Sequence, residues 1–190
     1  MAGRCPTDTC RVTPHGGYHF WRPDQVDPKS GNRGVMHWAW DLGGTAMSTP
    51  VYSPEDGIVV EIGTGLSSPW TGFNPGLVLV LGKSGVYHVL GHLDYNTILV
   101  RGGQTVAMGQ KVGVMGISHT HWEIRHNRTP DWSAYPTYWQ AHGPNSIDPV
   151  AWLAEVNAAP TAVGAVGALL LGSAMIGAGF ALARVLFGRR

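Results

Sequence analysis

Short apolar runs separated by turn residues limit the fold of this chain more strongly than any other feature. Three runs of five or six residues, rich in valine, leucine and isoleucine, lie at positions 57–62, 77–81 and 86–90. They are bounded by Asp-Gly, Pro-Gly and Lys-Ser-Gly, which favour tight turns between strands. The 27 glycines and 13 prolines are spread among such runs, which argues against a helical domain. We predict a mainly β domain built on an antiparallel sheet.

Further signals extend this pattern toward the C-terminus. The junction at 81–86 predicts a hairpin, and 112–115 and 119–125 continue the series of strands. Asp148 followed by Pro149 predicts the start of a short helix, because aspartate caps a helix and proline suits its first position. The domain is expected to end near residues 156–161.

Histidines recur at positions that suit a metal site. His119 and His121 stand two residues apart in a predicted strand, so both side chains point to the same face. His37 and Asp41 form a second cluster far upstream, and His92 stands alone between them and the strand. These groups supply the nitrogen and oxygen ligands of a catalytic zinc, with histidines left over for proton transfer.

In order and spacing these residues resemble the lysostaphin-type (LytM-type) zinc endopeptidases of bacterial cell walls, which carry H-x-x-x-D, an isolated H-L, and H-x-H before an aromatic residue and glutamate. The similarity runs from about residue 20 to residue 153. Other parts that carry it are Phe20, Arg22, Asp27-Pro28 and Gly31, then Thr49-Pro50-Val51 and Asp56-Gly57, then 102–116, and last Ile147-Asp148-Pro149 with Trp152-Leu153.

The resemblance implies a role for each member of the pattern. His37, Asp41 and His121 would be the zinc ligands, and His119 and His92 the catalytic histidines. Three protein ligands leave a fourth position for a water, whose pKa zinc lowers from about 15.7 toward 7. The implied substrate is the peptide stem or cross-bridge of peptidoglycan, and the implied fold is an antiparallel β peptidase domain.

Residues next to the pattern have open roles. Glu123 and Arg125 share the strand face of the two histidines, where either could orient a ligand or be exposed. His88 lies four residues before His92 and would share its face, unless Gly91 bulges the chain. Three tryptophans adjacent to ligands are candidates for the wall of a substrate cleft: Trp38, Trp40 and Trp122.

Charge and cysteine content limit the partners and the compartment. A net charge of +1, with only 13% of residues charged, gives no basic field for nucleic acid. Cys5 and Cys10 can form a small disulfide loop in an oxidising compartment, and a pair of free thiols is the alternative.

The C-terminal part differs in kind from the rest. Residues 162–183 carry no charge, and as a helix they would span about 33 Å, against about 30 Å for the hydrocarbon core of a bilayer. We predict an extension at 1–19, a peptidase domain at 20–155, a linker at 156–161 and a transmembrane or membrane-anchor helix at 162–187. The alternative is a glycine- and alanine-rich helix buried against another protein.

The two ends of the chain together suggest a location. Arginines follow the apolar segment, whereas the first 20 residues show no signal peptide. We expect the protein to be part of a bacteriophage particle. Its C-terminal helix would contact a membrane or virion proteins, and its peptidase domain would open the cell wall during entry. The alternatives are a host enzyme that remodels the wall from the bacterial envelope, and a structural or regulatory relative that binds the wall without catalysis.

Overall fold

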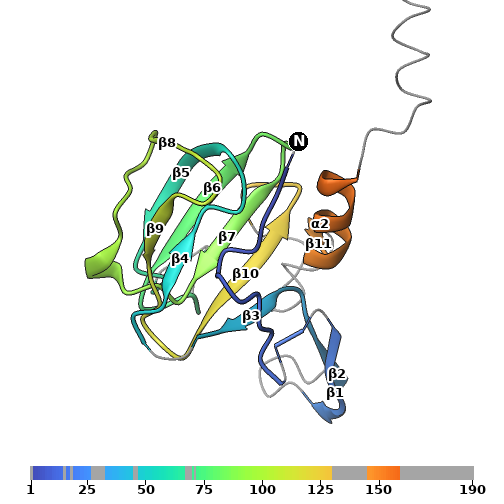
Figure 1. Cartoon of the computed structure of the whole chain (residues 1–190). Coiled ribbons are helices and arrows are strands. Elements are labelled where there is room, and N and C mark those ends of the chain that lie inside the picture. Colours follow the sequence, from blue (N-terminus) through green and yellow to red (C-terminus); the bar gives the residue numbers. More distant parts are fainter. Residues whose placement is uncertain are drawn as a thin grey trace, which may run out of the picture. The chain divides into compact units, whose positions relative to one another are not determined.

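Strands dominate the residues that the structure, a computed structural model, describes: 2–14, 16–17, 19–26, 33–44, 47–66, 70, 72–129 and 145–158. The strands are β1 (His19–Val26), β2 (Arg33–His37), β3 (Trp40–Gly43), β4 (Pro50–Tyr52), β5 (Gly57–Gly63), β6 (Leu77–Gly82), β7 (Tyr87–Gly91), β8 (Thr105–Val106), β9 (Lys111–Val114), β10 (His119–Arg125) and β11 (Ser146–Ile147). A 3-10 helix, η1 (Tyr95–Thr97), and an α-helix, α2 (Pro149–Asn157), complete these elements (Figure 1). The prediction of a mainly β antiparallel domain is confirmed.

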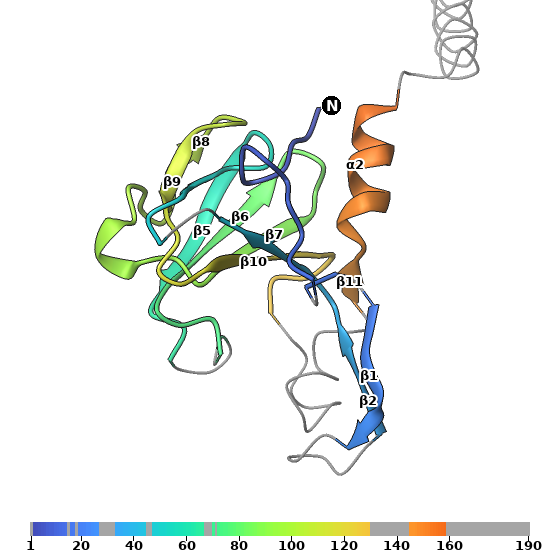
Figure 2. The ribbon, with the colours of Figure 1, turned by 60° about the horizontal axis from the view of Figure 1, so that its bottom comes forward.

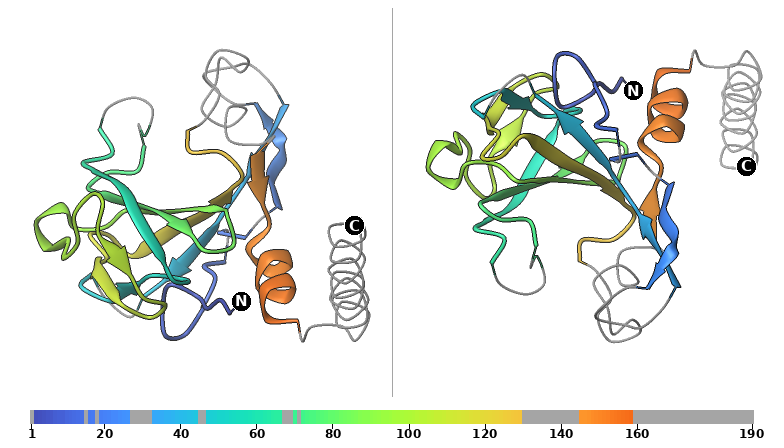
Figure 3. Two further views of the ribbon diagram at one scale, coloured as in Figure 1. Left: turned by 90° about the horizontal axis from the view of Figure 1, so that it is seen from above. Right: turned by 90° about the horizontal axis from the view of Figure 1, so that it is seen from below.

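The main sheet is built around β10. In the described residues it has the order β11-β10-β7-β6-β5-β8, with β3 also paired to β10. Since His121 and Trp122 pair with both β7 and β3, β3 lies on the edge of β10 opposite β7. The β6–β7 pair, with Leu81 opposite Tyr87, is the hairpin predicted from the sequence. The separate β1–β2 hairpin extends away from this sheet (Figures 1 and 3).

One face of the main sheet forms the larger of two hydrophobic clusters, here called the core. The two-stranded β4–β9 ribbon covers it, and Val51 and Val112 of that ribbon join Val80, Leu90 and Trp122 of the sheet in one buried cluster. Burial of such apolar side chains contributes about 1.5 to 3 kcal/mol each. The core therefore holds β10 firmly by one of its faces and leaves the other face for polar groups.

Alternation along β10 separates core from site. Trp122 and Ile124 are fully buried in the core, whereas His119 and His121 point to the other face. The prediction that Trp122 lines a cleft is therefore wrong, because neighbouring residues of a strand point to opposite faces and Trp122 directly follows His121. Trp40 is partly buried and packs edge-on against Trp122, with ring centroids 6.2 Å apart.

His88 lies in the core rather than at the site. It stands opposite Ile124 and is fully buried, with its Nε2 2.8 Å from Glu55 Oε1. Trp122 Nε1 donates to His88 Nδ1 at 3.3 Å. A neutral histidine with its proton on Nε2 satisfies both contacts. His88 therefore packs inside the core with both ring nitrogens hydrogen-bonded.

The short helix at the end of the domain begins as predicted. Asp148 Oδ1 accepts a hydrogen bond from the amide of Val150 at 2.9 Å, and Pro149 is the first helical residue. Trp152 on α2 is buried, and its ring lies edge-on to Trp122 with centroids 5.9 Å apart. Figure 2 shows α2 following β11.

Cys5 and Cys10 are joined in a disulfide, so the alternative of two free thiols does not hold in this structure.

The predicted helix at 162–187 lies outside the described residues, as do Asp27, Pro28 and Gly31. Among the helices that the structure describes, none has the length and apolar character needed to cross a membrane. The domain boundaries, the anchor and the phage location remain predictions.

Candidate metal site

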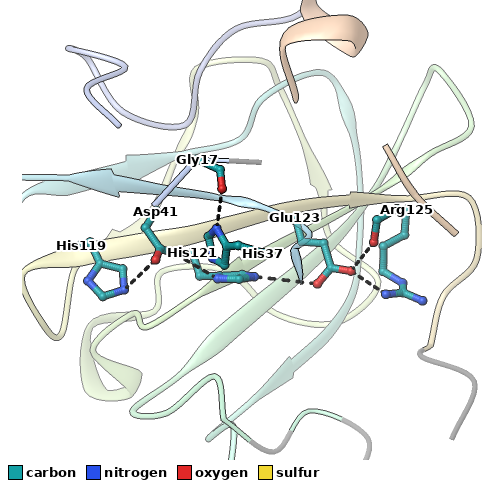
Figure 4. A network of polar contacts seen from close by, with 8 residues as sticks. Gly17, His37, Asp41, His119, His121, Glu123 and Arg125 are labelled. Atoms are coloured by element: carbon teal, nitrogen blue, oxygen red, sulfur yellow. Dashed lines mark hydrogen bonds and ion pairs between the residues drawn. The ribbon is translucent and has the colours of Figure 1, made fainter. Parts of the chain in front are cut away.

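Three strands bring the predicted ligands together. His37 ends β2, Asp41 lies in β3, and His121 lies in β10 directly opposite Asp41. His121 Nδ1 is 3.0 Å from Asp41 Oδ1, and His37 Nε2 is 3.4 Å from the same oxygen. One donor atom from each residue lies within 4.8 Å of the others. Figure 4 shows the three side chains converging on one point.

The outer nitrogens of both imidazoles have partners. His37 Nδ1 donates to the carbonyl oxygen of Gly17 at 3.0 Å. His121 Nε2 lies 3.8 Å from Glu123 Oε2 (Figure 4). When the two imidazoles are neutral, as ligands must be, these partners favour the tautomers with a lone pair on Nε2 of His37 and on Nδ1 of His121, the nitrogens that face Asp41.

Glu123 is itself held in place. Its side chain is 1% exposed, so the alternative that it is a solvent-exposed residue is wrong. Glu123 Oε1 accepts hydrogen bonds from Arg125 Nη1 and, at 2.9 Å, from Ser146 Oγ. Arg125 is fully buried, and its other Nη reaches Asn127 Oδ1 at 3.1 Å. A buried carboxylate with these donors keeps a fixed orientation toward His121.

The site favours positive charge at its centre. Burial alone would raise the pKa of Asp41, but the close imidazoles of His121 and His37 outweigh it and hold that pKa well below its usual range. Burial alone would lower the pKa of His121, but Asp41 and Glu123 raise it to about 9. Without a metal, His121 therefore holds a second proton, and its Nδ1 carries that proton toward Asp41, on the side where a cation would be stabilised.

His92 and His119 stand beside the three ligands. Their ring centroids are 4.9 Å apart, and His119 Nε2 lies 3.7 Å from Asp41 Oδ2. His92 Nδ1 donates to the carbonyl oxygen of Asn74 at 2.7 Å, which leaves its Nε2 unprotonated. Burial and the neighbouring His121 lower the pKa of His92 to about 4, and burial lowers that of His119.

Backbone conformation brings His92 to this face. Simple alternation would place it in the core with His88 and Leu90, but β7 ends at Gly91 and His92 has a left-handed φ of 61°. That conformation is uncommon for a residue with a side chain and is kept at functional sites when the surroundings enforce it. Here the amide of His92 donates to Phe73 and its carbonyl accepts from Gly116.

Sequence reasoning missed three contributors to the site. The carbonyls of Gly17 and Asn74 orient His37 and His92, and a backbone carbonyl leaves no residue-type signal. Phe73 is fully buried and lies edge-on to His121, with ring centroids 5.0 Å apart. Phe73 lies between β5 and β6, outside any strand, and its place between two predicted strands was the signal that could have found it.

The sequence profile of peptidase family M23 matches residues 35–131. That range contains the three predicted metal ligands and the two predicted catalytic histidines: His37, Asp41, His121, His92 and His119. The chain belongs to peptidase family M23. No curated protein sequence matches it.

Solved structures similar to this M23 domain include a zinc-containing peptidase from Vibrio cholerae. The two are 30% identical with a TM-score of 0.51, over 68% of this chain and 38% of that one. Lysostaphin in solution is 19% identical with a TM-score of 0.54, over 83% of this chain and 56% of lysostaphin. The catalytic domain of lysostaphin from Staphylococcus simulans is 19% identical with a TM-score of 0.50, over 77% and 93%.

The matched shares show which part of each similar protein corresponds to this chain. This M23 chain matches only 38% and 56% of the Vibrio peptidase and of lysostaphin, but 93% of the catalytic domain of lysostaphin. At 19% identity the lysostaphin structures show a shared fold alone.

Proposed function

We propose that this M23 domain is a zinc-dependent endopeptidase that hydrolyses peptide cross-links of peptidoglycan. The observation that carries the proposal is the convergence of His37, Asp41 and His121 beside two further imidazoles. Membership of a peptidase family supports the reaction class. The similar structure named as a zinc-containing peptidase supports the metal. The resemblance of the histidine and aspartate motifs to those of cell-wall endopeptidases supports the substrate class.

The donor set fits zinc. His37 Nε2, Asp41 Oδ1 and His121 Nδ1 would hold the ion, and two imidazole nitrogens with one carboxylate oxygen are a common ligand set of catalytic zinc. Their outer atoms are already held by Gly17 and Glu123, as the orientation of ligand histidines requires. When bound, zinc supplies a Lewis acid that polarises the scissile carbonyl and acidifies a water.

The two remaining histidines move protons. His92 is neutral at pH 7, because burial and the nearby His121 lower its pKa to about 4, and its unprotonated Nε2 is free to accept a proton from the attacking water. His119 stands next to both His92 and Asp41, where its ring can hydrogen-bond to the carbonyl oxygen or deliver a proton to the departing amine.

Mass spectrometry of fragments released from sacculi of defined cross-link chemistry tests the proposal. The full chain should release peptide fragments, and a chelator should stop the release. His121→Ala and Asp41→Ala should lose zinc and activity together. His119→Ala should keep zinc and lose most of its turnover, because general acid-base groups contribute on the order of 100- to 10,000-fold.

The exposed His126 provides the matched control. His126→Ala should bind zinc and cleave sacculi like the wild type. Full cleavage by His119→Ala, or stoichiometric zinc in the double variant His121→Ala, Asp41→Ala, would contradict the assignment of roles. An intact chain that takes up no zinc would overturn the proposed function itself.

A further inference from the structure

Residues 11–14 and 16–17, here called the N-terminal segment, run along the outer edge of β3. The amide of Gly43 donates to the carbonyl of Arg11 at 2.8 Å. The amide of Thr13 donates to the carbonyl of Asp41 at 2.8 Å, and the amide of Asp41 donates to the carbonyl of Gly16 at 2.7 Å. Both backbone groups of this ligand are therefore bonded to the N-terminal segment.

This pairing determines how Asp41 faces His121. The two residues are opposite each other in an antiparallel pair, and the backbone groups of Asp41 point away from β10 to the segment. They therefore form a non-hydrogen-bonded pair, the arrangement that brings opposite side chains closest together. The 3.0 Å contact between Asp41 Oδ1 and His121 Nδ1 follows from that geometry.

The same segment also holds a second ligand. Gly17 accepts the hydrogen bond from His37 Nδ1 at 3.0 Å (Figure 4). The contact between the segment and β3 is close, because a Cβ built on the buried Gly16 would overlap Asp41 Cβ and Thr13 Oγ1. Two of the three proposed ligands thus depend on one stretch of backbone that precedes the M23 match at residues 35–131.

We propose that the N-terminal segment is a positioning element of the metal site, so that zinc affinity depends on its docking against β3. The inference rests on the proposed function, since it concerns the same ligands. It assigns a role in the peptidase site to residues within the predicted extension at 1–19. The residues act through Asp41 and His37, to which they are hydrogen-bonded.

Docking and zinc binding must be coupled in both directions. If docking of the segment raises zinc affinity, zinc raises the stability of docking by the same factor. Hydrogen-deuterium exchange on the wild-type chain, with zinc and with chelator, measures this without any substitution. Exchange of the Thr13 amide should slow when zinc is bound. The Arg4 amide, which donates to the carbonyl of Pro54 and to none of the ligand strands, is the internal control and should not change.

A substitution in the N-terminal segment provides a second test of the positioning role. Gly16→Ala should force the segment away from Asp41 and lower zinc affinity, measured by competition with a chelating dye, on the order of 10- to 100-fold. Gly102→Ala is the matched control, because a Cβ there meets nothing within 4 Å. Thermal unfolding of both zinc-free variants identifies any general loss of structure in Gly16→Ala, in which case the exchange experiment decides alone.

The outcomes separate the two proposals. No zinc binding by the wild type overturns the proposed function and not the backbone pairing described here. Zinc binding by the wild type with unchanged exchange at Thr13 overturns the positioning role. Equal zinc affinity in folded Gly16→Ala and Gly102→Ala overturns it as well.

Discussion

Glu123 Oε2 lies 3.8 Å from Nε2 of His121, two residues away on the same strand and on the same face. With Arg125 and Ser146 bonded to its other oxygen, Glu123 is oriented toward the proposed ligand. For the neutral imidazole, the contact favours the tautomer with its proton on Nε2, which leaves the lone pair of Nδ1 toward Asp41.

Loss of this carboxylate should weaken zinc binding. We expect Glu123→Gln to lower zinc affinity on the order of tenfold, because an amide oxygen still accepts from His121 but carries no charge. Competition with a chelating dye measures the affinity. Glu61→Gln, which changes a partly buried glutamate of β5, is the matched control and should bind zinc like the wild type. Wild-type affinity in Glu123→Gln would contradict the orienting role.

Zinc affinity should rise with pH. Although burial opposes it, Asp41 and Glu123 raise the pKa of metal-free His121 to about 9, so His121 is protonated at pH 7. Zinc binds only the neutral imidazole and must displace this proton, which gives roughly a tenfold gain in affinity per pH unit below that pKa. Calorimetry at pH 7 in two buffers of different ionisation enthalpy should show release of one proton per zinc. Zinc binding without proton release would contradict this prediction.

The buried pair of His88 and Glu55 should make stability depend on pH. Burial lowers the pKa of His88, so below about pH 6.5 the unfolded chain binds a proton that the folded chain does not. Stability therefore falls on acidification from pH 7 to 5. In this range Glu55 adds little, because hydrogen bonds from His88 and Ser84 outweigh the effect of burial and keep its pKa lowered.

Replacement of His88 by glutamine tests this contribution. A glutamine side chain is uncharged at every pH, so His88→Gln should lose less stability on acidification than the wild type, by up to about 1.4 kcal/mol per pH unit. Urea unfolding of the zinc-free chain between pH 5 and 7.5 gives the difference. The exposed His126→Gln serves as control, and identical pH dependence in wild type and His88→Gln would contradict the prediction.

The disulfide should stabilise the fold without affecting the metal site. Replacing both Cys5 and Cys10 by serine removes a short closed loop, which should lower the free energy of unfolding by about 2 kcal/mol. Zinc affinity should stay unchanged, because residues 11–14 and 16–17 keep their own hydrogen bonds to β3. Urea unfolding and dye competition on the same variant check the two statements. A large loss of zinc affinity would show that the disulfide loop itself supports the site.

The sequence by itself determined the strands that bury apolar runs and the chemical groups at the site. Residues 77–81 form a strand whose leucines and valines are mostly buried, and residues 57–62 form one because β-branched isoleucine and valine favour a pleated, half-buried surface. His119 and His121 share a face because every strand alternates with period two. By contrast, β3 was not foreseen as a strand, since Trp40–Gly43 is a short run of four residues whose conformation depends on pairing with β10.

Only the tertiary structure decided where these groups meet. His121 and Asp41 are 80 residues apart, and their contact depends on a strand register that no local pattern encodes. His92 faces the site, and His88 does not, because backbone conformation at residue 92 overrides the alternation of β7. The carbonyls that orient His37 and His92 come from Gly17 and Asn74, and every residue type carries such a carbonyl. Their role is therefore set by position in space and leaves no mark on the sequence.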